Sequence, residues 1–111
     1  MEDAHELAHN KSEEMLTHSA IITKLSADGS QVKATYKIDA QGRKLTATCH
    51  YAHKYSTLEN HMAAAIRVTE KIQGLHESEY EHKTKVSLSS KAVSMEYGYM
   101  FLIDVDFCPK E

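Results

Sequence analysis

The chain has 111 residues, of which 41% are hydrophobic and 26% are charged, and its formal net charge is −3. These values are typical of one globular domain with a single small core. The negative charge argues against a general attraction to nucleic-acid backbones, and no apolar run is long enough to span a membrane. No signal-peptide core follows Met1, so we expect a cytoplasmic protein with no membrane partner. We expect residues 1–111 to form a single domain, and the elements described below predict an α+β class.

The first predicted element is a helix over residues 1–16. Asp3 is a suitable N-cap residue, and Glu6 follows three positions later, as in a capping box. The apolar stripe of this segment is narrow, and Lys11 interrupts it. We therefore expect the helix to dock loosely on the rest of the domain.

Three strands are predicted next, over residues 17–25, 31–39 and 43–53. Apolar and polar side chains alternate in the second and third strands, which indicates one buried and one solvated face. The connections at 26–30 and 40–42 contain Gly29 and Gly42, which suit tight turns. The sequence therefore predicts an antiparallel meander.

The best helix signal in the chain covers residues 56–75. Ser56 and Glu59 form a predicted capping box, and Gly74 indicates the end of the helix. The residues predicted for its buried half are Leu58, Met62, Ala65, Ile66, Val68, Ile72 and Leu75. His61 falls within this arc, and we expect it to be partly buried at the edge of the core.

Two further strands are predicted, a weaker one over residues 82–90 and a long alternating run over residues 92–107. Sixteen extended residues would span ~53 Å, whereas a domain of this size has a radius of gyration of ~13 Å. The long run must therefore bend, bulge near Gly98 or project onto a partner. The expected order is α-β-β-β-α-β-β, with a largely antiparallel sheet and the 56–75 helix packed on one face.

The strongest interaction signal lies in the last strand, where the candidate interface residues are Tyr99, Met100, Phe101 and Leu102. Met100 and Leu102 have the parity of the solvated face, yet both are apolar. The strand is therefore apolar on both faces, and a second layer should cover it. Two covering layers are compatible with the sequence, namely the N-terminal helix and a second copy of the chain related by a two-fold axis.

A candidate metal motif lies at His5-Glu6-Leu7-Ala8-His9, which resembles the His-Glu-x-x-His motif of zincin metalloproteases. Two histidines four positions apart on a helix share one side, where they can bind zinc, and the resemblance implies that Glu6 would act as the general base. The resemblance covers these five residues, and no strand precedes them as it does in the zincins. We expect a solvated helix face here, with zinc binding by His5 and His9 as the alternative.

Two other residue clusters are candidate sites. Cys49, His50 and His53 could be metal ligands, but strand parity places His50 on the face opposite to the other two. A set of lysines has solvent parity on the predicted strands, namely Lys33, Lys37, Lys44, Lys83 and Lys85. These lysines could bind an acidic partner, but few aromatic side chains accompany them for stacking on bases.

No cofactor is predicted, and no convergent set of nucleophile, base and orienting residue is evident. We therefore expect a small binding protein without enzymatic activity, acting as a homodimer that binds a protein partner. The first alternative is a small zinc-dependent hydrolase that uses His5, Glu6 and His9. The second is a binder of nucleic acid or acidic protein through the lysine-rich sheet face.

Overall fold

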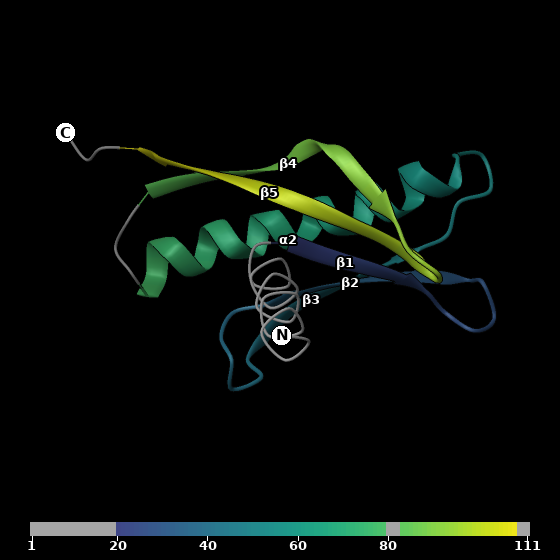
Figure 1. Cartoon of the computed structure of the whole chain (residues 1–111), viewed down its shortest axis with the longest axis horizontal. Coiled ribbons are helices and arrows are strands. Elements are labelled where there is room, and N and C mark those ends of the chain that lie inside the picture. The colour runs from purple at the N-terminus through teal and green to yellow at the C-terminus, as the bar shows by residue number, and fades with distance from the viewer. Residues whose placement is uncertain (1–19, 80–82, 109–111) are drawn as a thin grey trace, which may run out of the picture.

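The computed structural model describes residues 20–79 and 83–108. Five strands and one helix lie in these ranges (Figure 1): β1 (Ala20–Leu25), β2 (Gln31–Lys37), β3 (Lys44–His50), α2 (Thr57–Glu79), β4 (Lys83–Ser94) and β5 (Gly98–Cys108). The helix expected over residues 1–16 lies outside the described residues. The predicted α+β class, with an antiparallel sheet and one helix packed on it, is confirmed.

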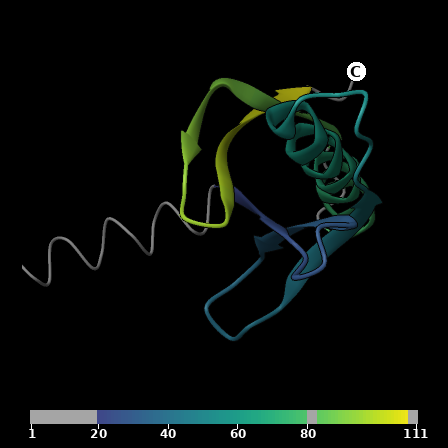
Figure 2. The ribbon, with the colours of Figure 1, turned by 90° about the vertical axis from the view of Figure 1, so that its right-hand side faces the viewer.

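The sheet has the order β3-β2-β1-β5-β4, and every neighbouring pair is antiparallel. It is strongly curled, and α2 lies along its concave side (Figure 2). Because of this curl, one helix contacts all five strands. The side of the sheet that faces α2 is called the inner face below, and the opposite side is called the outer face.

The two turns of the meander form where the sequence predicted them. Gly29 and Gly42 have φ angles of 74° and 99°, in the left-handed region that favours glycine. The Asp28 carboxylate accepts hydrogen bonds from the Ser26 hydroxyl at 2.7 Å and from the Ser30 hydroxyl at 2.7 Å. These bonds stabilise the ionised carboxylate and lower the pKa of Asp28 to about 2.

The N-terminus of α2 carries the predicted capping box. The Glu59 N–H donates to Ser56 Oγ and the Ser56 N–H donates to Glu59 Oε1, both at 3.1 Å. Asn60 then joins the helix to the preceding loop, since its side chain accepts from the Ala52 N–H at 2.7 Å and donates to the Ala52 carbonyl at 2.9 Å. Asn60 is consequently buried, although its polarity indicated a solvated position.

Two predictions about α2 are wrong. The buried face is rotated from the predicted one, because Leu58, Met62 and Ile66 are exposed whereas Asn60 and Ala64 are buried. The bonds of Asn60 to the loop account for part of this rotation. The helix also continues past Gly74 to Glu79, since nothing requires a positive φ at Gly74 and a single glycine costs a helix only ~1 kcal/mol.

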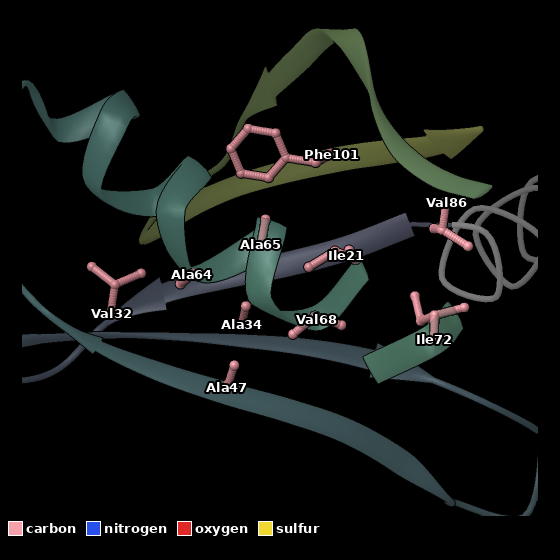
Figure 3. Packing of buried hydrophobic residues seen from close by; sticks show 10 residues of the cluster. All are labelled: Ile21, Val32, Ala34, Ala47, Ala64, Ala65, Val68, Ile72, Val86 and Phe101. Carbon is pink, nitrogen blue, oxygen red and sulfur yellow. The ribbon is translucent and has the colours of Figure 1, made fainter. Parts of the chain in front are cut away.

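The core lies between α2 and the inner face, and its members are small or medium-sized apart from one aromatic residue (Figure 3). The cluster consists of Ile21, Val32, Ala34, Ala47, Ala64, Ala65, Val68, Ile72, Val86 and Phe101. The alanines let the helix approach the strands closely, because a short side chain leaves little space between backbones.

The helix also contacts the two edge strands of the sheet, β3 and β4, through polar side chains. Gln73 Oε1 accepts from the Val86 N–H of β4 at 2.8 Å, and Lys71 Nζ donates to the Thr46 carbonyl of β3 at 2.5 Å. These side chains form hydrogen bonds with main-chain groups that an edge strand would otherwise offer to another chain. A third contact joins His76 Nδ1 and Thr84 Oγ1 of β4 at 2.9 Å.

The expectation of one long run over residues 92–107 is wrong, because the chain reverses at residues 95–97. The Met95 N–H donates to the Gly98 carbonyl at 2.8 Å and closes this turn between β4 and β5. β4 therefore extends to Ser94, and its pairing with β5 is interrupted by an irregularity between Leu88 and Ala92. The turn divides the predicted run, so that residues 92–94 belong to β4 and β5 has 11 residues.

Gly98 has a definite structural role at this reversal. A Cβ atom at this position would overlap the backbone carbonyl of Thr23 in β1. The glycine thus permits the close approach of β5 to β1 at the end of the sheet.

Candidate functional site

The candidate interface residues of β5 lie on two different faces. Tyr99 and Phe101 point to the inner face, and Phe101 is part of the core. Met100 and Leu102 lie on the outer face, as their parity predicted. Strand pairing places Ile22 and Val93 on either side of Met100, so a cluster of apolar side chains lies in the middle of the outer face. We call Ile22, Val93, Met100 and Leu102 the outer patch.

The outer patch is accessible to a partner to different extents along its length. Val93 is 47% exposed, and Ile22, Met100 and Leu102 are half-buried. In the alternating run of the sequence, Val93 has the same parity as Phe101. The hairpin reverses that relation, because Val93 pairs with Met100 while Ala92 pairs with Phe101. The alternation pattern therefore contains no signal that Val93 is a surface residue.

Lysines gather on the outer face beside the outer patch. Lys24 pairs directly with Lys33, and Lys37 pairs directly with Lys44. Like charges at directly opposed positions repel each other, so this part of the sheet favours an acidic neighbour. Lys24 is also stabilised by the Tyr97 ring, whose centroid lies 5.5 Å from its Nζ.

Acidic side chains occur on the other side of the outer patch. Asp104 and Asp106 of β5 are exposed, and Asp106 pairs with Lys85 of β4, whereas Asp104 pairs with Ser87. The outer face is therefore basic over β1, β2 and β3, apolar in the middle, and mixed in charge over β4 and β5.

A second exposed apolar group lies on α2. Leu58, Met62 and Ile66 follow one another at a spacing of four residues and form a stripe along the helix. Sequence periodicity had assigned these three residues to the core. The periodicity alone could not reveal the rotation of the helix that exposes them.

An open cavity of about 1000 Å³ lies at the end of the sheet where α2 begins. It is bordered by the β1–β2 hairpin, the β4–β5 hairpin and the first turns of α2, and we call it the hairpin cavity. The side chains that matter most for its chemistry are Leu25, Thr57, His61, Met95, Tyr97 and Tyr99.

His61 is the most unusual member of this lining. Its side chain is 1% exposed, and Nδ1 lies 2.7 Å from Thr23 Oγ1. The ring also meets the Tyr99 ring edge-on, with centroids 5.0 Å apart and an interplanar angle of 71°. Burial lowers the pKa of His61 below its usual value, because the charged imidazolium loses its hydration.

Within the described ranges 20–79 and 83–108, no group of three or more His, Cys, Asp or Glu side chains is close enough to hold a metal ion. This includes Cys49, His50 and His53, while His5, Glu6 and His9 lie outside the described residues. No helix in the same ranges is long and apolar enough to cross a membrane.

Comparisons of the chain with protein-family models, with curated proteins and with solved structures found no match.

Proposed function

We propose that this chain is a small interaction protein without enzymatic activity, which forms a homodimer in the cytoplasm and binds a protein partner. The outer patch carries this proposal. A contiguous apolar surface that interrupts a charged sheet face is typical of a protein–protein contact. A second copy is a suitable cover because it supplies an identical patch across a two-fold axis.

The charges around the patch favour one orientation of the two copies. A two-fold axis parallel to the strands places the lysine side of one copy against the β4–β5 side of the other. The lysine side carries Lys37 and Lys44, and the β4–β5 side carries Asp104 and Asp106. An axis perpendicular to the strands would place lysine against lysine, which is repulsive. We therefore propose the parallel axis.

The test is Met100→Glu combined with Leu102→Glu, with the native mass read by light scattering. We expect the wild-type protein to be a dimer and the double variant to be a soluble monomer, because two carboxylates cannot be buried without partners. A matched control is Ala63→Glu with Ser78→Glu, which adds the same charge at exposed positions of α2, on the other side of the sheet. A double variant that stays dimeric would overturn the proposal. An unfolded double variant would assign the cover to residues 1–19, because Ala20, the first described residue, pairs with Leu102.

The proposed axis has its own test by charge exchange. Lys37→Glu should weaken the dimer, and Asp104→Lys added to it should restore the affinity. Failure of the second change to restore binding would reject the parallel axis without rejecting the dimer. Salt should weaken the wild-type dimer only modestly, because the apolar centre provides most of the affinity.

Two alternatives are tested in the same samples. Stoichiometric zinc that is lost in His5→Ala would favour the hydrolase, and would replace the present proposal. Binding of DNA, RNA or an acidic protein with a steep salt dependence would favour the lysine face, since each neutralised phosphate contributes to that slope. The directly opposed lysine pairs are the observation that supports this second alternative.

A further inference from the structure

We infer that the hairpin cavity is a binding site for a small, uncharged and mainly apolar molecule that carries a hydroxyl or amide N–H donor, which His61 accepts at Nε2. This inference does not depend on the dimer, because the hairpin cavity lies at one end of the sheet and the outer patch lies in the middle of its outer face. It rests on the hydrogen bonds around Thr23, on the second nitrogen of His61 and on the apolar walls.

The hydrogen bonds of Thr23 identify the tautomer of His61. Thr23 Oγ1 lies 2.7 Å from His61 Nδ1, 3.2 Å from the Tyr99 nitrogen and 3.3 Å from the Tyr99 carbonyl oxygen. A hydroxyl has one proton to donate and two lone pairs with which to accept. All three bonds form together only if the hydroxyl donates to the Tyr99 carbonyl and accepts from both nitrogens. His61 must then carry its proton on Nδ1.

The same assignment leaves Nε2 as a hydrogen-bond acceptor. No described residue forms a hydrogen bond with Nε2. Within residues 20–79 and 83–108, no side-chain nitrogen or oxygen is both sealed from solvent and without a partner. Nε2 therefore keeps a small accessible area, and His61 lines the hairpin cavity. Burial keeps the imidazole neutral at pH 7, so that Nε2 retains its lone pair.

The walls define the rest of the ligand. Leu25, Met95, Tyr97 and Tyr99 present apolar and aromatic surface, and Tyr97 and Met95 remain exposed on the β4–β5 hairpin. The lining also includes the exposed charged residues Lys24, Lys33 and Glu96. Concave sites that combine apolar walls with a few placed polar groups are typical of small-molecule pockets. An aromatic ring with one hydroxyl satisfies both requirements, since the ring can stack on tyrosine and the hydroxyl can donate to Nε2.

The experiment compares phenol with anisole, which has the same ring but no proton to donate. Binding is followed by NMR, using long-range 1H–15N correlations of the His61 ring. We expect the free protein to show the Nδ1–H tautomer, and phenol in the millimolar range to move the Nε2 resonance. Anisole should bind about fivefold more weakly, the loss expected for one neutral hydrogen bond, and should leave the Nε2 resonance in place.

A variant identifies the group that discriminates between the two probes. His61→Phe keeps an aromatic ring against Tyr99 and removes Nε2, and Thr23 keeps its bonds to the Tyr99 backbone. We expect this variant to bind phenol and anisole equally. His53→Gln, which changes an exposed histidine outside the hairpin cavity, should retain the preference for phenol.

Three results would overturn the inference. They are an Nε2–H tautomer in the free protein, equal binding of phenol and anisole by the wild-type chain, and the absence of phenol binding in the millimolar range. If His61→Phe does not fold, the Nε2 resonance of the wild-type protein decides the question by itself. Perturbations confined to Leu58, Met62 and Ile66 would place the binding on the exposed stripe of α2 and would also count against the hairpin cavity.

Discussion

Along α2, the C-terminal half is held between both edges of the sheet, whereas the N-terminal half borders an open cavity. In the C-terminal half, Ile72 is fully buried and Gln73 and Lys71 contact main-chain groups of opposite edge strands. In the N-terminal half, the polar side chains of Asn60 and His61 are buried, and Leu58 in the same turn is 37% exposed. The comparison indicates that one helix end stabilises the fold while the other is available for binding.

The largest expected effect on stability comes from a substitution at Gly98 of β5, which borders the open cavity beside the N-terminal half of α2. Gly98→Ala should cost at least ~3 kcal/mol in free energy of unfolding, because the new Cβ would overlap the backbone of Thr23, which cannot move aside as a flexible side chain can. Urea denaturation measures this loss. Gly74→Ala is the matched control, since nothing lies within 4 Å of the new Cβ and the helix should gain up to ~1 kcal/mol. Equal effects of the two substitutions would show that β1 and β5 do not approach each other as described.

The second prediction tests the difference between the two halves of α2 directly. Ile72→Ala should cost ~2–4 kcal/mol, because it removes fully buried methyl groups and leaves a cavity. Leu58→Ala should cost less than ~1 kcal/mol, since that side chain already contacts solvent. The same urea experiment compares them. A cost at Leu58 as large as that at Ile72 would mean that Leu58 is covered in solution, for example by a second copy.

The features that the sequence predicted correctly are those that depend on residues close together in the chain. Ser56 and Glu59 form the capping box, and Gly29 and Gly42 form the turns, because each of these features depends on residues within a few positions of one another. The alternation of apolar residues also predicted the meander and placed Met100 and Leu102 on the outer face.

The features that the sequence missed depend on distant contacts. The rotation of α2 follows in part from bonds between Asn60 and the loop before the helix, which a helical wheel does not include. The reversal at residues 95–97 has no Asn-Gly or Asp-Gly signal, and Gly98 is required by Thr23, a residue far away in the chain. His61 was expected at the edge of the core, and only the pairing of β1 with β5 brings Thr23 and Tyr99 beside it.

The smallest expected effect is the pH dependence of stability that His61 provides. Its pKa is lowered in the folded protein, so the unfolded state binds the proton more tightly. Stability from this group should therefore be complete above the unfolded pKa of about 6.5 and should decrease as pH falls toward the folded pKa, below which it stays constant. Urea denaturation between pH 7.5 and pH 5 measures the decrease. His61→Phe should remove this part of the pH dependence, and His53→Gln should not.

The contribution of Asp28 to stability belongs to a separate pH range, because its folded pKa of about 2 confines the loss of that stability to pH values below 4. A wild-type stability that is flat between pH 7.5 and pH 5 would show that His61 is as well hydrated in the folded chain as in the unfolded one. In that case the N-terminal half of α2 would be more open than the contacts with Thr23 and Tyr99 indicate.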